Sequence, residues 1–256
     1  MTKDAIVKQE GAGPLVVPDF LKGETGGEGF GNMDSKDVII PRLCFTQALT
    51  PQKKKSNVNH IEGLTDGDMF NSVSGEIYGN PEKPIQVIPL QFTKSRIFFK
   101  DMTDGGGILC QSFNGVDGGS ISPLCADCPN SKFDANGGTP ACTLFNNYLS
   151  VILPQRELIV VSLKSSALKV ARQWNARMKM LGNKPMFAGV YEIKLVETKN
   201  SKGEYFVPAI TLKRFVNQDE FNYAKETFNN LSGKNVQIHQ DDEQHTPEGS
   251  EEDIPF

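Results

Sequence analysis

The stretch Ile85-Gln86-Val87-Ile88-Pro89-Leu90-Gln91-Phe92 decides the fold class, because it is rich in the β-branched residues that favour strands. The segment Lys94–Lys100 follows after a single residue and is also strand-like. Proline cannot donate a ladder hydrogen bond, so Pro89 is expected at an edge or at a bulge. The centre of the chain is therefore predicted to be β-structure.

Strand patterns continue on both sides of this stretch. A hairpin is predicted from Met69–Val73 through Ser74-Gly75 to Glu76-Ile77-Tyr78, and four later strands are expected over residues 144–153, 157–163, 187–197 and 204–215. Helices are expected over 165–181, which Gly182 ends, and over 218–231, with Asn217 as N-cap. About seven strands without a βαβ rhythm favour a small twisted barrel or open sheet, mainly β, with one internal and one C-terminal helix.

The charge is distributed unevenly along the 256 residues, which carry 27 Lys and Arg against 31 Asp and Glu, a net −4. Residues 235–256 hold seven acids and no Lys or Arg, whereas residues 34–234 hold 24 basic and 19 acidic residues. The mean therefore hides a basic body and an acidic tail. We predict a flexible Gly-rich arm over 1–33, a folded domain over 34–234 and a disordered tail over 235–256.

No apolar run approaches the roughly 18 residues of a membrane helix, and the start Met1-Thr2-Lys3-Asp4 has no apolar signal region. We therefore expect a soluble cytoplasmic protein without a membrane partner.

Four of the five cysteines form the pattern Cys-x14-Cys-x2-Cys-x13-Cys at Cys110, Cys125, Cys128 and Cys142. Two residues between Cys125 and Cys128 let both thiolates reach one metal, and tetrahedral zinc needs two more ligands. The surrounding segment 101–142 is Gly-rich and has few apolar positions for a core. We expect a structural Zn²⁺ held by these four cysteines; disulfides, which a reducing compartment disfavours, and unrelated buried thiols are the alternatives.

Motifs for catalysis are absent from the sequence. It contains no phosphate-binding Gly-x-x-x-x-Gly-Lys-Ser/Thr loop, no Gly-x-Gly-x-x-Gly after a strand and no nucleophile elbow. No histidine lies between residues 61 and 238, and Asp101 and Asp104 are two acids in a Gly-rich loop rather than a nuclease site. We expect a protein that is not an enzyme.

Cations and aromatic residues alternate along several predicted strands. Such strands bind single-stranded nucleic acid when Lys and Arg follow the phosphates and aromatic faces stack on bases. Because neighbours on a strand point to opposite faces, Lys94, Arg96, Phe98 and Lys100 are expected on one face and Ile97 and Phe99 on the other. Most of the 16 Phe must nevertheless fill the core. The candidate DNA contacts are Lys94, Arg96, Phe98, Lys100, Tyr148, Arg156, Lys194, Tyr205, Lys213 and Arg214.

The chain ends in Asp253-Ile254-Pro255-Phe256, where two large apolar residues follow an acidic stretch. A tail that serves only solubility does not need them, so Ile254 and Phe256 are expected to fill an apolar pocket of a partner protein. This tip resembles the C-terminal tip of bacterial single-stranded DNA-binding proteins. That resemblance implies an OB-fold that binds the strand, and a tip that recruits replication and repair proteins.

The body is longer than in the bacterial family and is more similar to bacteriophage single-stranded DNA-binding proteins, which join an elaborated OB-type core to an acidic tail. Asp37–Leu43 and Ile85–Phe92 with Lys94 carry this second resemblance. It implies an OB-like barrel with a zinc insertion at 101–142, acting in phage DNA replication, recombination or repair in the host cytoplasm. The implied partners are single-stranded DNA and a polymerase, helicase, primase or nuclease bound through the tip, with a homo-oligomer as a further option.

Two other functions fit part of the sequence. A zinc-containing regulator that reads duplex DNA requires a recognition helix, and Arg172, Gln173, Asn175 and Arg177 on the 165–181 helix fit this in part. The second alternative is a protein-interaction adaptor, which binds no nucleic acid and acts only through the tip Asp253–Phe256.

Overall fold

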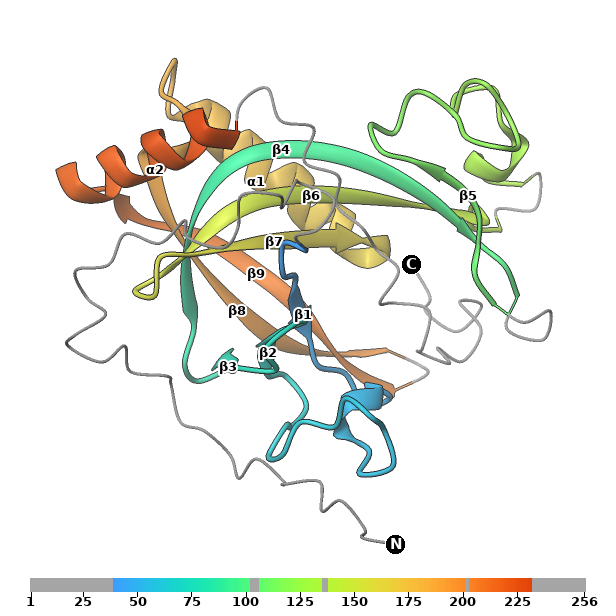
Figure 1. The fold of residues 1–256 in the computed structure, drawn as a ribbon, viewed down its shortest axis with the longest axis horizontal. Coiled ribbons are helices and arrows are strands. Elements are labelled where there is room, and N and C mark those ends of the chain that lie inside the picture. The colour runs from blue at the N-terminus through green and yellow to red at the C-terminus, as the bar shows by residue number, and fades with distance from the viewer. Residues whose placement is uncertain (1–38, 102–105, 135–137, 201–202, 232–256) are drawn as a thin grey trace, which may run out of the picture. The chain divides into compact units, whose positions relative to one another are not determined.

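The computed structural model describes residues 39–101, 106–134, 138–200 and 203–231, with Asn200 described by its backbone alone. The predicted arm over 1–33 and the predicted tail over 235–256, including Asp253–Phe256, lie outside the described residues. The described part is mainly β, with two sheets and two α-helices (Figure 1). None of its helices is both long enough and apolar enough to cross a membrane.

The larger sheet has the strand order β7-β6-β4-β8-β9, and β5 pairs with β4 beside this path. All pairings within it are antiparallel. The strand bounds are β4 Ile85–Phe99, β5 Ile108–Ser112, β6 Cys142–Leu153, β7 Glu157–Lys164, β8 Gly189–Asn200 and β9 Gly203–Phe215. The smaller sheet is antiparallel in the order β1-β2-β3, with β1 Leu43–Phe45, β2 Met69–Asn71 and β3 Ile77–Gly79. It contains the predicted hairpin.

The central strand β4 is one continuous strand, where the sequence suggested two. Thr93 pairs with Asn147 of β6, so the ladder is not interrupted between the two predicted segments. One edge of β4 pairs with β6, while the other pairs with β8 at Ile85–Val87 and with β5 at Arg96–Phe99. The β4–β6 register shifts between Pro89 and Gln91, which confirms the predicted bulge. Pro89, which has no N–H to donate, therefore lies where the regular hydrogen-bond ladder is interrupted.

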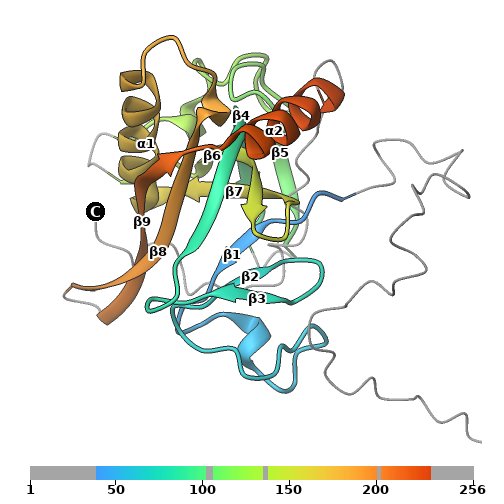
Figure 2. The ribbon, with the colours of Figure 1, turned by 90° about the vertical axis from the view of Figure 1, so that its left-hand side faces the viewer.

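Of the two predicted arrangements, a small barrel and an open sheet, the described strands form the open sheet, because β7 and β9 end the path and do not pair with each other. The helix α1, Leu168–Met180, packs against the sheet (Figure 2). Its Trp174 is fully buried, with its ring stacked on Tyr148 of β6 at 4.2 Å between centroids and edge-on to Tyr191 of β8 at 5.6 Å. These ring contacts hold α1 against this face of the sheet.

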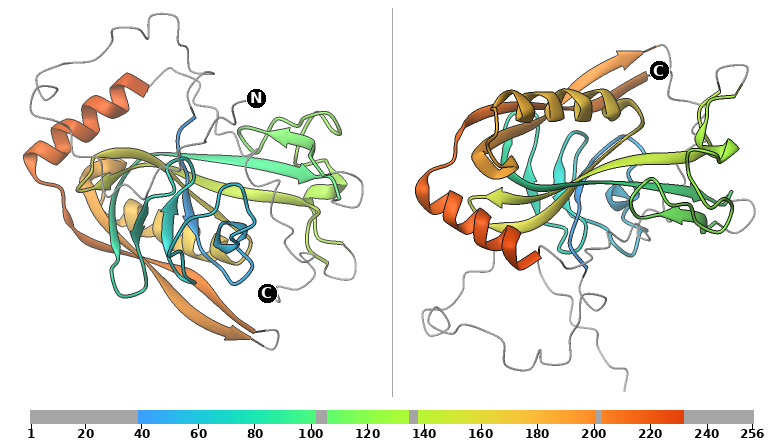
Figure 3. Two further views of the ribbon diagram at one scale, coloured as in Figure 1. Left: turned by 60° about the horizontal axis from the view of Figure 1, so that its bottom comes forward. Right: turned by 90° about the horizontal axis from the view of Figure 1, so that it is seen from above.

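The second helix, α2 Gln218–Leu231, covers the opposite face of the sheet. Its Ala224 and Phe221 pack with Ile88, Leu90 and Val151, whereas α1 packs with Val87 and other residues that point the other way. The two helices therefore lie on opposite sides of the strands, as the view from above in Figure 3 shows. α2 occupies the predicted range 218–231, and Glu220 N–H donates to the Asn217 side chain at 2.9 Å, which confirms the predicted N-cap.

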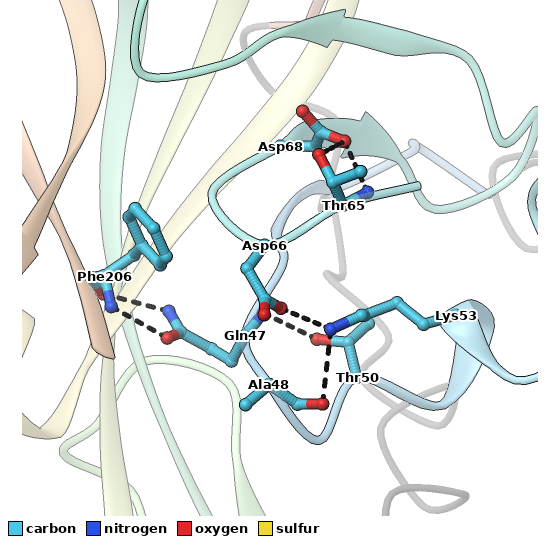
Figure 4. Close-up of polar contacts among 8 residues, drawn as sticks. All are labelled: Gln47, Ala48, Thr50, Lys53, Thr65, Asp66, Asp68 and Phe206. Atoms are coloured by element: carbon cyan, nitrogen blue, oxygen red, sulfur yellow. Dashed lines mark hydrogen bonds and ion pairs between the residues drawn. The ribbon is translucent and has the colours of Figure 1, made fainter. Parts of the chain in front are cut away.

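Segments in and around the smaller sheet contact the larger sheet at several points, among them the Tyr78 hydroxyl of β3, which donates to the Glu157 carboxylate of β7. Arg42 forms a parallel bridge with Val160 of β7. Further on, the side-chain amide of Gln47 pairs with the backbone of Phe206 on β9 (Figure 4). The loop that holds Gln47 is closed by the ion pair of Lys53 with Asp66 at 2.5 Å and by the hydrogen bonds of Thr65 to Asp68.

Candidate nucleic-acid interface

The second half of β4 presents Lys94, Arg96 and Phe98 on one face, as predicted. They pair in register with Asn146, Leu144 and Cys142 of β6, with no shift between them, so the three side chains alternate with Ser95 and Ile97. Ile97 is fully buried and Ser95 nearly so, whereas Lys94 is exposed and Arg96 and Phe98 are half-buried. Lys100 is exposed just beyond the last residue of β4. We call the surface of Lys94, Arg96 and Phe98 the β4 face.

The β4 face continues the surface on which α1 packs. Phe92 lies two residues before Lys94 on the same side of the strand, and its ring is 5.1 Å from that of Tyr148. Tyr148 in turn stacks on Trp174 of α1. The β4 face is therefore exposed sheet immediately beyond the part that α1 covers.

The cations of the β4 face have no acidic partner among the described residues. Lys94 and Lys100 form no ion pair there, and the Arg96 guanidinium donates to the Cys142 carbonyl at 3.5 Å. Gly115 approaches Lys94 so closely that an added Cβ would lie 3.0 Å from the Lys94 Cβ. The β4 face thus has positive charge, an aromatic ring and a nearby loop.

The other predicted contacts are spread over separate places. Lys194 is exposed and Tyr205 is half-buried on the β8–β9 pair. Lys213 is paired with Glu192 at 2.9 Å, and Arg214 binds Glu220 through two hydrogen bonds of 2.7 and 2.8 Å. These two acids largely neutralise the charge that Lys213 and Arg214 would offer to a phosphate.

Tyr148 is not available as a base-stacking residue. It is fully buried, and its hydroxyl donates to the Ala171 carbonyl at 3.1 Å and lies 3.0 Å from the Asn175 side-chain oxygen. Its prediction as a DNA contact is therefore corrected. A sequence pattern cannot separate an aromatic on the open part of a strand face from one that a helix covers.

A pocket of about 590 Å³ brings together Arg156 and Arg214. Arg156 occupies the β6–β7 turn with a φ of +61°, and its guanidinium lies 5.3 Å from the Tyr223 ring centre. Lys83 also lines the pocket, but so do Asp219 and Glu220, so acids offset most of its positive charge. This pocket is distinct from the β4 face.

The cysteines gather around the far end of β4. Cys110 of β5 and Cys142 of β6 both pair with Phe98 from opposite sides, so all three side chains lie on one face. The Cys128 N–H donates to the Cys125 carbonyl at 3.3 Å, and the Ser131 hydroxyl contacts both of these residues' carbonyls. Cys125, Cys128 and Cys142 are buried, and all five cysteines are free thiols.

Burial and neighbouring groups change the pKa of the Cys142 thiol. Its pKa is raised to about 11, chiefly by burial and in part by the nearby Cys125 and Cys110, against the lowering effect of Arg96. No three or more His, Cys, Asp or Glu side chains of the described residues are arranged to hold a metal ion. The four cysteines therefore lie near one end of the sheet. The described residues do not show them arranged as the ligands of one metal ion.

The exposed cations of α1 are absent from the predicted contacts. Lys169, Arg172 and Lys179 project from the helix and Lys184 follows it. Their signal in the sequence is the lack of any Asp or Glu between residues 158 and 191. Of the proposed base-reading set on this helix, Asn175 contacts the Tyr148 hydroxyl, Arg177 donates to the Ile210 carbonyl and Arg172 donates to the Leu168 carbonyl.

Comparison with known proteins places the chain in one family. A search of curated proteins and a search of solved structures each found no match. The model of the family described as "Pam3 phage gp34-like protein" matches residues 8–237, which is most of the chain and includes every described element. A family described by a phage protein supports the phage origin that the sequence predicted. The chain belongs to the Pam3 phage gp34-like protein family.

Proposed function

We propose that this protein binds single-stranded DNA without sequence preference and acts in phage DNA replication and recombination, as a binding protein rather than an enzyme. The observation that carries the proposal is the β4 face, where the cations of Lys94 and Arg96 lack an acidic partner among the described residues and adjoin the Phe98 ring. Cations that follow phosphates and rings that stack on bases are the two components of sequence-tolerant single-strand binding.

The sheet supports an elaborated OB-type core in this proposal. OB-folds are five-stranded, partly open barrels, and the main path here has five antiparallel strands with α1 in place of closure. We assign an OB-like core because the sheet has the strand number of an OB-fold and because the sequence resembles bacteriophage single-stranded DNA-binding proteins.

The acidic tail completes the proposed function. Its seven acids end at Ile254-Pro255-Phe256, a short apolar group that suits a pocket with a basic rim on a polymerase, helicase, primase or nuclease. The tip recruits such a partner while the body holds and protects the strand, in the cytoplasm of the host cell.

We propose that Cys110, Cys125, Cys128 and Cys142 hold a structural Zn²⁺ that cross-links the insertion. No described residue of 106–134 belongs to either apolar core, so the segment needs another source of order. Large apolar side chains there are exposed instead, namely Leu109, Phe113, Val116, Ile121, Leu124 and Phe133. The thiolates of these cysteines suit a closed tetrahedral zinc site, and the metal would supply structure rather than chemistry.

Fluorescence anisotropy with matched single-stranded and duplex oligonucleotides over a salt series tests the proposal. Tight, salt-sensitive binding to several unrelated single strands is the expected result. A preference for duplex favours the regulator, and the absence of any binding favours a protein-interaction adaptor; either outcome overturns the proposal. The variant Phe98→Ala, compared with Phe133→Ala on an exposed loop position, checks that the ring of the β4 face takes part.

A further inference from the structure

We infer that the exposed face of α1 is the main phosphate-binding surface, and that single-stranded DNA runs from this helix onto the β4 face. The inference rests on the proposed function and names where the backbone of the strand lies. Its residues are Lys169, Arg172, Lys179 and Lys184, which we call the α1 cations.

The charge of this region is segregated to a degree that the composition does not explain. Residues 158–191 carry six cations and no acid, although the chain as a whole has more acids than bases. At the chain average of 31 acids in 256 residues, a segment of this length would hold about four. Solvated surfaces ordinarily mix both signs, so a one-sign face indicates a partner of opposite charge.

The burial of α1 fixes which way these cations point. Ala171, Trp174 and Met178 are buried against the sheet, and the opposite side of the helix is left to solvent. Lys169, Arg172 and Lys179 are exposed, and none has an acidic partner among the described residues. Arg172 and Lys179 lie two turns apart on one flank, roughly 10 Å along the axis, so a strand's backbone can meet them in succession.

Helix stability accounts for Lys179, which lies in the last turn of α1 where a cation suits the helix dipole, but not for Lys169 near the start. Lys169 is the second residue of α1, which continues directly from the 3-10 turn Ser165–Ala167, and neither element has an acid in its first turn or a side-chain cap. A cation there opposes the helix dipole. By contrast α2 begins with the Asn217 cap and with Asp219 and Glu220 in its first turn. The start of α2 thus has a cap and acids that stabilise a helix, whereas the start of α1 has a cation and no side-chain cap. A bound polyanion would offset the unfavourable charge at α1.

The α1 cations and the β4 face belong to the same side of the sheet. The rings of Trp174, Tyr148 and Phe92, which contact one another in that order, connect the buried side of α1 to the strand segment that bears Lys94 and Arg96. A strand held along α1 therefore reaches Phe98 without crossing the sheet. In contrast, the cations Lys213 and Arg214 are already neutralised by Glu192 and Glu220.

Contacts within the chain favour backbone binding over reading of duplex bases by α1. Asn175 and Arg177, two of the side chains suited to reading base edges, are already engaged by the Tyr148 hydroxyl and the Ile210 carbonyl. Gln173 and Arg172 remain exposed, with Arg172 donating to the Leu168 carbonyl, beside Lys169 and Lys179, and lysines bind phosphates as point charges. The expected ligand is therefore the backbone of a single strand, without sequence preference.

The test compares the full-length double variant K169E/R172E with the matched control K54E/K55E, which makes the same charge change on an exposed loop. Loss of two phosphate contacts should lower single-strand affinity at least tenfold at low salt and reduce the slope of log K against log salt by about 1.4. The control should keep the wild-type slope. An unchanged slope in K169E/R172E, or equal losses in both variants, overturns the inference, as does a wild-type preference for duplex. If the wild-type protein binds no DNA, it is the proposed function that fails.

A second measurement separates binding from folding. K169E replaces a cation at the start of α1 by an anion, so its melting temperature should equal or exceed that of the wild type. Weaker binding by this more stable variant supports the inference. Wild-type affinity of K169E, K179E and K184E taken singly and together contradicts it.

Discussion

The side-chain amide of Gln47 forms two hydrogen bonds with the backbone of Phe206, each 2.9 Å long. The amide nitrogen donates to the Phe206 carbonyl, and the amide oxygen accepts from the Phe206 N–H (Figure 4). Gln47 thus takes the place of a neighbouring strand on the outer edge of β9. Residues two apart share an edge, and there Pro208 has no N–H to offer while the Ile210 carbonyl accepts from Arg177. The stretch of the β9 edge from Phe206 to Ile210 is therefore blocked against pairing with another chain.

Replacing Gln47 by Ala should lower the free energy of unfolding by about 1–3 kcal/mol, because two half-buried hydrogen bonds are lost together. Urea denaturation followed by Trp174 fluorescence measures the change. Gln173→Ala, which removes an exposed amide from α1, should change stability by less than about 0.5 kcal/mol and serves as the control. Equal stability of the two variants would show that the Gln47 pair does not hold the edge.

Tyr148→Phe should reduce stability and leave DNA binding unchanged. The hydroxyl loses its contacts with Ala171 and Asn175, at a cost of about 1 kcal/mol. Burial raises the pKa of Tyr148 above its usual range, so the phenol is neutral at all ordinary pH values and the effect should not vary between pH 6 and 9. Thermal denaturation and anisotropy on the same samples test this. A loss of single-strand affinity greater than the loss of folded protein would show that Tyr148 does contact DNA.

Glu220 should make the stability depend on pH in the acid range. The Arg214 guanidinium, which donates to both carboxylate oxygens, lowers the pKa of Glu220, and the Asn217 N–H lowers it further. Because the folded-state pKa lies below the unfolded value of about 4.3, the contribution is complete above that pH and is lost as the pH falls through the folded-state pKa.

The variant Glu220→Gln should therefore be less stable than the wild type by about 1 kcal/mol at pH 7, a modest amount because Arg214 is partly exposed. The difference should shrink toward pH 3. Asp219→Asn, an exposed first-turn acid on the same helix, should show only a few tenths of a kcal/mol. Urea melts of the three proteins at several pH values give the comparison, and a gap that stays constant with pH would refute the pair as its source.

Metal content should depend on the four insertion cysteines and not on Cys44. Elemental analysis of the purified protein should give about one Zn²⁺ per chain, as a closed four-thiolate site requires. Cys125→Ser/Cys128→Ser should lose it, and Cys44→Ser should retain it. A chelator should expose residues 106–134 to limited proteolysis while the Trp174 core keeps its fluorescence. A metal-free wild-type protein with a protease-resistant insertion would exclude zinc as the source of order there.

Several elements follow from local chemistry that is visible in the sequence. The bulge at Pro89 follows from the missing proline N–H, and α2 follows from an asparagine cap with two acids after it. The apolar spacing of three and four placed Ala171, Trp174 and Met178 on the buried side of a helix. The predicted β4 face emerged because strand alternation depends only on the backbone.

Long-range packing decided what these patterns left open. Among the described strands, β7 and β9 end the sheet without pairing with each other, and no local pattern reveals which strands become the edges. Tyr148 and Phe98 each have cationic or polar residues two positions away on both sides, yet Tyr148 lies beneath α1 and Phe98 remains half-exposed. The charges of Lys213 and Arg214 were cancelled by Glu192 and Glu220, the first across two strands and the second from the start of α2.

The sequence by itself determined the mainly β class, the strand faces, the two helices, the cysteine spacing and the separation of a basic body from an acidic tail. These properties depend on residue type and on periods of two and 3.6 residues, which act over a few neighbours. Only the tertiary structure decided that the sheet stays open, that Gln47 closes its β9 edge, and which cations remain without an acidic partner among the described residues. Those outcomes depend on groups that meet across more than a hundred residues, as Gln47 and Phe206 do, and local pattern carries no information about such a meeting.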